Sequence, residues 1–205
     1  MRILAIDPGY ERLGIAVVEK LPRQKEMLLY STCIRTPKTL SHSARLLKIA
    51  DEVRNVIREY EPEGFAIETL FLAVNHKTVM PVAEARGAVL VEAARVGLPV
   101  YEYTPLQIKI AVTGYGRSDK KQVTEMVKKL IVIPERTSLL PKKAVLPLLR
   151  ENKSPHPETH PSPPKRAGLP LLGEIGRIRL DDEYDAIAVG LTCMASQKWN
   201  MDHEI

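Results

Sequence analysis

The stretch "MRILAIDPGYERLGIAVVEK" (residues 1–20) carries the pattern that decides the fold. An apolar run over residues 3–6 ends at Asp7, turns through Pro8-Gly9 and is followed by a second apolar run from Gly14 to Val18. Short β-branched runs separated by Pro-Gly predict two strands joined by a tight turn. A carboxylate at the end of a buried strand is unfavourable unless a positive group meets it. Asp7 therefore either caps the turn or binds a cation.

The overall composition is that of an ordinary globular protein. The 205 residues suffice for one α/β domain with a sizeable core, at 44% hydrophobic and 27% charged residues. No segment reads as a secretory signal or as an apolar stretch long enough to span a bilayer. Two distant cysteines, Cys33 and Cys193, suggest neither a disulfide framework nor a zinc site, which favours a reducing cytoplasm.

The net charge gives only a weak indication of the partner. A formal charge of +5 and a pI near 9.2 hint at a polyanion. Residues 134–180 hold nine Lys/Arg and four Asp/Glu, a balance of +5, so the rest carries 21 of each sign (30 − 9 and 25 − 4). Net charge therefore does not identify the folded part as a nucleic-acid binder, and the placement of the charges must decide.

Alternating strand and helix patterns predict an α/β fold. The expected strands are 2–7, 13–20, 26–35, 64–68 and 99–103, and the expected helices are 41–60, 78–96, 105–113, 119–131 and a last one within 179–195. Gly97 should end the second helix, and Ser118 should cap the fourth. Because crossovers are right-handed, strand 64–68 should lie parallel to the first strand. We predict a five-stranded mixed sheet, three antiparallel strands and then two parallel ones, flanked by helices.

Four carboxylates are candidates for one cluster. Parallel strands would place Asp7 and Glu68 at the same carboxyl edge, where open α/β sheets hold their sites. Asp182 and Asp185 are spaced i, i+3 in the last helix and share one face. Bare carboxylates would repel one another and raise their pKa values. Ligands that are all oxygen suit Mg²⁺ or Mn²⁺, and two such ions about 4 Å apart can hydrolyse a phosphodiester.

Taken together, four segments resemble the RuvC family of Holliday junction resolvases, which has an RNase H-like fold. They are "ILAIDPGYERLGIAVVE", "FAIETLF", "VYEYTPLQIKIAVTGYGRSDKKQV" and "DDEYDAIAVGL", and the match covers about residues 1–133 and 179–195. The resemblance implies a Mg²⁺-dependent endonuclease with two ions per site, for which Mn²⁺ can substitute. The implied metal ligands are Asp7, Glu68, Asp182 and Asp185. Lys109 and Lys120 are the implied basic residues near the scissile phosphate.

Further residues are candidates for DNA binding. The resemblance places Phe71 beside the junction centre, where it can stack on unpaired bases, although a core position is the alternative. Lys120, in the first turn of a helix, is unfavourable for the helix dipole unless a phosphate binds there. Lys109 is either a phosphate contact or a snorkelling side chain. The expected DNA-binding set is Phe71, Lys77, Lys109, Tyr115, Arg117, Lys120 and Lys121.

The resemblance also implies partners. It predicts a cytoplasmic homodimer that binds a four-way DNA junction and nicks two strands symmetrically during recombination and repair, alongside a RuvA–RuvB branch-migration complex. A C2 dimer fits a two-fold substrate that is cut twice. The helix at 78–96, with its apolar "GAVLVEAARVG", is the candidate interface.

Two departures from the family pattern accompany this interpretation. A proline-rich basic insert at about 134–178 interrupts a single domain of residues 1–197, with a tail at 198–205, and we expect the insert to loop out beside the site. Val74 stands where we expect a basic residue in many relatives, so one DNA contact is either lost or taken over by Lys77. Three alternatives stay open: an RNase H-like nuclease for another branched or hybrid duplex, a non-catalytic junction binder, and an actin-like nucleotide-binding protein.

Overall fold

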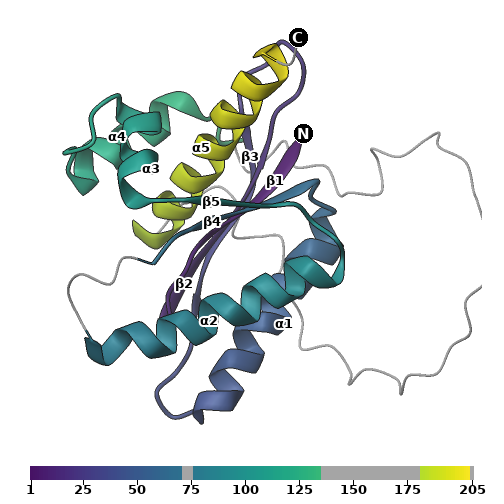
Figure 1. Cartoon of the computed structure of the whole chain (residues 1–205), viewed down its shortest axis with the longest axis vertical. Coiled ribbons are helices and arrows are strands. Elements are labelled where there is room, and N and C mark those ends of the chain that lie inside the picture. Colours follow the sequence, from purple (N-terminus) through teal and green to yellow (C-terminus); the bar gives the residue numbers. More distant parts are fainter. Residues whose placement is uncertain (71–75, 135–180, 204–205) are drawn as a thin grey trace, which may run out of the picture.

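The fold is built on one mixed five-stranded sheet. The computed structural model describes residues 1–70, 76–134 and 181–203. The strands are β1 (Arg2–Asp7), β2 (Arg12–Glu19), β3 (Met27–Arg35), β4 (Gly64–Glu68) and β5 (Val100–Tyr103). They lie in the order β3-β2-β1-β4-β5, with helices on both faces (Figure 1).

The pairing of the strands confirms the predicted sheet. β1 pairs with β2 and β2 with β3 in antiparallel fashion, whereas β1–β4 and β4–β5 are parallel. The central strand β1 is buried along Ile3–Ile6, since both faces of the sheet are covered. In the parallel pair Ile6 lies opposite Ile67, so Asp7 and Glu68 are the next residues at the same end.

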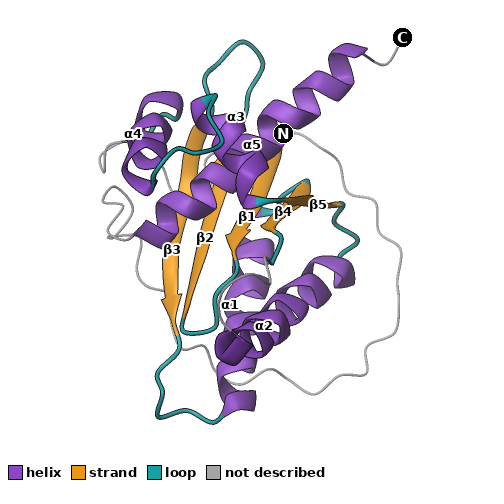
Figure 2. Cartoon of the chain, turned by 60° about the vertical axis from the view of Figure 1, so that its left-hand side comes forward, coloured by secondary structure: helices purple, strands orange, loops and turns teal. Residues whose placement is uncertain are grey.

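One face of the sheet is covered by α1 (His42–Tyr60) and α2 (His76–Arg95) (Figure 2). Ser41 caps α1 by accepting a hydrogen bond from the Ala44 amide. α2 begins earlier than predicted, so Pro81 is its sixth residue and not part of the first turn. Gly97 follows α2 with φ +71°, the left-handed conformation predicted for the residue that ends this helix.

The other face is covered by α5 (Asp181–His203), against which α3 (Pro105–Thr113) and α4 (Lys120–Leu130) pack. α3 begins with a capping box between Thr104 and Gln107. The prediction of Ser118 as the cap of α4 is wrong. The neighbouring Asp119 caps this helix, because Ser118 is buried and its hydroxyl donates to the Tyr115 carbonyl.

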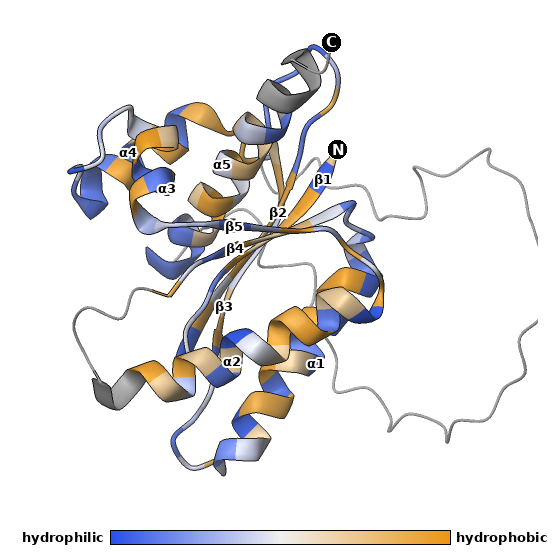
Figure 3. Cartoon of the chain, viewed as in Figure 1, coloured by the Kyte–Doolittle hydropathy of each residue, from blue (hydrophilic) through white to orange (hydrophobic). Residues whose placement is uncertain are grey.

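Two apolar cores result, one on each side of the sheet. Leu4, Ile6 and Phe65 point toward α1 and α2, whereas Ile3, Ala5 and Ala66 point toward α5. Figure 3 shows apolar residues along the strands and a mixture of apolar and polar residues along the helices. Among the described helices none combines the length and hydropathy of a membrane span. The predicted insert at 134–178 falls almost wholly outside the described residues.

Candidate active site

Two strand ends bring the first two carboxylates together. Asp7 ends β1 and Glu68 ends β4, and the parallel register places them side by side at one edge of the sheet. The buried runs before them fix the backbone up to the last strand residue, while both acids are only half-buried as whole residues. This edge is the one predicted from the sequence.

Helix α5 adds the third carboxylate because it crosses the sheet at close range. Gly14, opposite Asp7 on β2, lies directly under the Asp182 carbonyl, where a Cβ would overlap the backbone oxygen. Further along, a Cβ on Gly190 would lie 2.9 Å from Val18 and 3.2 Å from Ala5. Glycine at these contacts lets α5 approach the strands, and Asp185 thereby faces Asp7.

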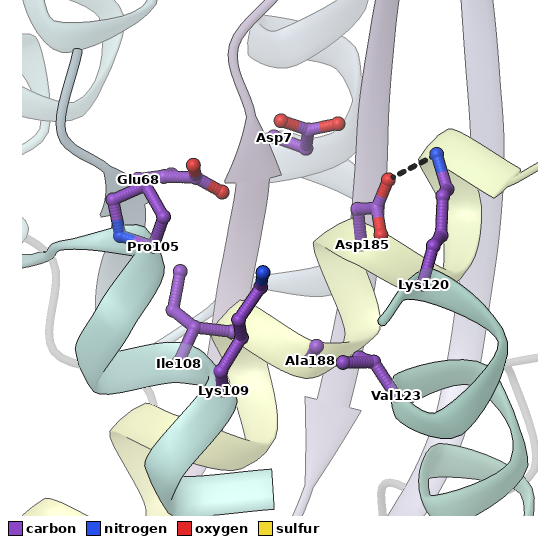
Figure 4. Close-up of a pocket in the computed structure, with 9 residues that line it drawn as sticks. All are labelled: Asp7, Glu68, Pro105, Ile108, Lys109, Lys120, Val123, Asp185 and Ala188. Atoms are coloured by element: carbon purple, nitrogen blue, oxygen red, sulfur yellow. Dashed lines mark ion pairs between the residues drawn. The ribbon is translucent and has the colours of Figure 1, made fainter. Parts of the chain in front are cut away.

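These carboxylates line a pocket of about 310 Å³ (Figure 4). Its acidic residues are Asp7, Glu68 and Asp185, and its basic residues are Lys109 of α3 and Lys120 of α4. Apolar side chains complete the wall, namely Pro105, Ile108, Val123 and Ala188. Five of the six residues predicted to be catalytic thus meet in one cavity.

Lys120 already contacts the acidic cluster. Its Nζ lies 2.9 Å from Asp185 Oδ2 and 3.7 Å from Asp181 Oδ2. Asp119 fixes this lysine as the first residue of α4 through its capping box with Gln122. Lys109 reaches the pocket from the middle of α3, and its charge acts on Glu68.

The environment of the pocket raises the pKa values of its three carboxylates. Burial, and then the charges of Glu68, Asp185 and Asp182, raises the pKa of Asp7 to about 8. Burial and Asp185 raise the pKa of Glu68 to about 7, against the opposing charge of Lys109. Burial also raises the pKa of Asp185, although Lys120 opposes this. The two lysines therefore leave an excess of negative charge, which a bound cation would neutralise.

Asp182 lies beside the pocket but does not line it. It forms an ion pair with Arg12, and the Cys33 thiol donates to the same Oδ2 over 3.5 Å. Its charge nevertheless acts on Asp7. In this arrangement, and within the described part of the chain, no three Asp, Glu, His or Cys side chains approach closely enough to hold one metal ion.

The predicted DNA-binding residues fall in two regions. Tyr115, Arg117 and Lys121 are exposed on or beside the connection from α3 to α4, next to the pocket lysines. Phe71 lies outside the described residues, as does Val74. Lys77 belongs to the first turn of α2, and its side chain also lies outside them.

Sequence reasoning missed Arg12 and Cys33. Both side chains lie on the α5 side of the sheet, because Arg12 precedes Gly14 by two residues and Cys33 is the cross-strand partner of Gly14. Burial raises the pKa of the Cys33 thiol, so it acts as a neutral donor to Asp182. The antiparallel pairing of the first two strands could have identified Arg12. It places Gly14 opposite Asp7, and Arg12, two residues before Gly14, lies on the same face.

Comparison with known proteins places this site in a family. Residues 3–144 match the family model described as crossover junction endodeoxyribonuclease RuvC. The chain belongs to the RuvC family. Its final acidic helix lies beyond the matched residues, so the assembly of Asp185 with the other acids is a result of the structure.

Individual RuvC proteins support this membership. The RuvC of Thermosipho melanesiensis is 46% identical over 131 residues, covering 64% of this chain and 83% of that protein. The RuvC of Desulfitobacterium hafniense is 45% identical over 135 residues, covering 66% and 81%. Thermus thermophilus RuvC in complex with a Holliday junction substrate superposes with a TM-score of 0.70 at 27% identity, covering 98% of this chain and 96% of that one.

Family membership confirms the predicted RNase H-like resolvase fold and the nuclease class, and it implies a divalent-metal-dependent reaction. It also removes one of the alternatives left open by the sequence. A nucleotide-binding protein of the actin-like class is excluded by the match to an endonuclease family.

Proposed function

We propose that this RuvC-family chain resolves four-way DNA junctions by nicking two strands symmetrically at the pocket formed by Asp7, Glu68 and Asp185. The observation that carries the proposal is the convergence of these acids with Lys109 and Lys120 in one cavity. The Thermus thermophilus relative was solved with a Holliday junction substrate. Acids, basic residues and a relative's substrate all point to the same chemistry, hydrolysis of DNA phosphodiesters at a branch point.

The donor set fits two Mg²⁺ ions, for which Mn²⁺ can substitute. Asp7, Glu68 and Asp185 would hold them with carboxylate oxygens, and Asp182 would complete the set as the fourth ligand. Burial and the neighbouring acids raise the pKa values of Asp7 and Glu68 despite the two pocket lysines, so a bound cation would be favourable there. When bound, divalent ions activate a water molecule and stabilise the leaving oxygen of the phosphodiester.

The chain's own basic residues orient the DNA strand. Lys109 and Lys120 flank the carboxylates from two helices, so they would hold the non-bridging oxygens of the scissile phosphate between them. Lys120 also pairs with Asp185. This ion pair would hold the Asp185 carboxylate in place until a metal ion binds it. The apolar wall of Pro105 and Ile108 limits water near the attacked phosphorus.

Contacts outside the pocket would position the junction. Arg117 and Lys121 extend the basic edge beyond the pocket lysines, and Tyr115, with 58% of its surface exposed, offers a ring for stacking. We assign Phe71 the role of the wedge at the junction centre, and Lys77 a phosphate contact. These contacts supply affinity, whereas the carboxylates supply the reaction.

We also propose a homodimer with α2 at its interface. Exposed small and apolar residues recur along one stripe of this helix with spacings of three and four residues: Met80, Ala83, Gly87, Val91 and Ala94. Such a stripe suits close helix packing across a two-fold axis. The dimer would present two pockets to one junction in the cytoplasm, with a RuvA–RuvB complex as its partner.

One substrate panel tests the function. The protein is incubated with Mg²⁺ and end-labelled four-way junction, linear duplex or RNA–DNA hybrid, and the products are separated on a denaturing gel. We expect two symmetrically placed nicks, one on each of two strands of the junction. The linear duplex and the hybrid should stay intact. Cutting of the hybrid with an intact junction would instead indicate an RNase H-like nuclease for another substrate.

A further inference from the structure

Arg12 is the strongest feature that the proposed mechanism leaves unused. It is the first residue of β2, its side chain is 47% exposed, and its Nη2 is paired with Asp182 Oδ2. Asp182 itself is only 19% exposed. Arg12 therefore pairs with Asp182, the one candidate metal ligand that does not line the pocket.

The backbone of Asp182 contacts the sheet closely although its side chain does not line the pocket. Its carbonyl oxygen rests on Gly14, whose place on β2 is directly opposite Asp7. A Cβ built on Gly14 would lie 3.2 Å from Asp7 Cβ, so the three residues are immediate neighbours. The charge of Asp182 acts on Asp7 even while its carboxylate is paired with Arg12.

A second arginine stands beside the first. In the antiparallel register Arg35 of β3 lies directly opposite Arg12, so both side chains are on the α5 side of the sheet. Arg35 is exposed and, among the described residues, it has no hydrogen bond or ion pair. Like charges placed opposite each other are unfavourable. An anion between them would remove this repulsion, and Asp182 provides it for Arg12 only.

The acids that line the pocket do not complete a metal site in their present arrangement. Three carboxylates line the pocket, yet no three of the described acids, histidines or cysteines are close enough to share one ion. Asp182 is a further carboxylate whose charge acts on both Asp7 and Asp185, and its release from Arg12 would supply additional oxygens. The same movement would leave Arg12 and Arg35 free as an adjacent pair of cations.

We propose that Arg12 is a positioning residue that holds Asp182 out of the metal pocket and exchanges this carboxylate for a DNA phosphate when divalent ions bind. The inference deepens the proposed function and rests on its metal site. Asp182 changes partner from Arg12 to the ions, and the guanidinium groups of Arg12 and Arg35 then receive one phosphate of the junction strand.

The exchange couples two binding events. Because the proposed movement takes the Asp182 carboxylate away from Arg12, metal and Arg12 compete for it, whereas metal and DNA assist each other. Coupling of this kind is reciprocal: bound metal strengthens junction binding by the same factor by which the junction strengthens metal binding. A role of Arg12 in folding alone would produce no such coupling.

Metal titration is the first test. Metal-free wild-type protein and Arg12→Gln are titrated with MnCl₂ by isothermal titration calorimetry in the absence of DNA. We expect Arg12→Gln to bind Mn²⁺ about three- to tenfold more tightly, since the competing ion pair is gone. Arg12→Lys, which can still pair with Asp182, should stay within about twofold of wild type.

Two controls separate the exchange from a general effect of charge. Arg35→Gln removes an equal charge from the same face without touching Asp182, so its Mn²⁺ affinity should change less than that of Arg12→Gln. In an Asp182→Asn background, Arg12→Gln should no longer tighten metal binding, because the contested ligand is absent. Equal effects of both arginines, or an undiminished effect in that background, would overturn the exchange.

Junction binding is the second test. Fluorescence anisotropy with a labelled four-way junction is measured in EDTA and in Ca²⁺, and a denaturing gel confirms that the strands stay intact. For wild type we expect tighter binding in Ca²⁺, and for Arg12→Gln and Arg35→Gln the loss of most of this gain. A gain that survives both substitutions would refute the phosphate contact.

The outcomes also separate this inference from the proposed function. If Asp7→Asn retains wild-type Mn²⁺ binding, the metal site itself is wrong, and the exchange with it. If Asp7→Asn loses Mn²⁺ binding while Arg12→Gln leaves the affinity unchanged or weakens it, the metal site stands and only the exchange is refuted.

Discussion

Asp7 concentrates the chemistry of this protein in a single residue. It ends a buried strand, it shares its pocket with Glu68 and Asp185, and burial and the charges of neighbouring acids raise its pKa to about 8. The sequence indicated this residue because a carboxylate after an apolar run requires a positive partner. Its partners came from three other elements, which only the fold assembled.

Substitution of Asp7 tests its role in the reaction. Asp7→Asn keeps the shape of the side chain but removes the charge that would bind the ions. We expect Mg²⁺-dependent junction cleavage to fall by at least about a thousandfold, while junction affinity measured in EDTA stays within about threefold, because phosphate contacts supply most of it. Gel-based cleavage and anisotropy measure the two effects. Cleavage at the wild-type rate would remove Asp7 from the mechanism.

The raised pKa values also predict how the stability of the metal-free protein depends on pH. Asp7 keeps its proton up to about pH 8 in the folded state but loses it near its ordinary value of 3.8 when unfolded. Glu68 behaves in the same way up to about pH 7. The folded state therefore holds more protons between these limits, so its stability falls as the pH rises from 4 to 8.

Thermal unfolding in EDTA measures this dependence. We expect the melting temperature to fall by about 5 °C or more between pH 5.5 and 8.5. Asp7→Asn should show a smaller fall, because it lacks the group with the most displaced pKa. Addition of Mg²⁺ should raise the melting temperature more at the higher pH. A flat wild-type profile, or equal Mg²⁺ effects at both pH values, would contradict this electrostatic account.

Helix α5 is the element on which the site depends. It carries Asp182 and Asp185, and it rests on β1 and β2 through the close contacts at Gly14 and Gly190. The sequence predicted the spacing of its acids and apolar residues. The sequence did not predict how far α5 lies from the sheet, because that distance depends on which small side chains meet across the interface.

Gly14→Ala tests the contact between α5 and β2. A Cβ at Gly14 would overlap the Asp182 carbonyl, so α5 would have to move. We expect a loss of about 2–4 kcal/mol in the free energy of unfolding, measured with urea, and weaker Mn²⁺ binding. The buried exchange Ala16→Gly, two residues along the same face, serves as a comparison in which space is created instead of filled. Wild-type stability of Gly14→Ala would show that α5 does not rest on β2 here.

Helix α2 carries the prediction about assembly. Val91 is 50% exposed in the middle of its apolar stripe. Val91→Glu would bring two buried charges together across a two-fold axis, so we expect monomers where wild type forms dimers. Light scattering after gel filtration measures the mass. Leu47→Glu on α1, also exposed but outside the stripe, is the matched control and should stay dimeric. A dimeric Val91→Glu would move the interface elsewhere.

At the scale of the whole molecule, segments from both sides of the predicted insert pack together in one of the two cores. α5 follows the insert, yet it packs on β1 and β2 from the start of the chain, and Ile187 and Val189 share a cluster with Ile3. This continuity supports the proposal of one domain over residues 1–197.

Deletion of residues 138–174 tests that proposal. The remaining residues still connect α4 to α5, and we expect the shortened protein to unfold cooperatively within about 5 °C of the wild-type melting temperature. Circular dichroism and calorimetry measure the fold and its stability. Insoluble protein, or loss of the cooperative transition, would show that the insert contributes to the core.

The sequence by itself determined the strands, their order and the meeting of Asp7 with Glu68. These follow from local patterns and from the right-handed crossover, and they need no knowledge of side-chain packing. The tertiary structure alone decided that Lys120 contacts Asp185, that Asp119 and not Ser118 caps α4, and that Arg12 holds Asp182. Such choices depend on side-chain directions and on how closely α5 approaches the sheet, and differences of about an ångström, which no sequence pattern encodes, select one partner over another.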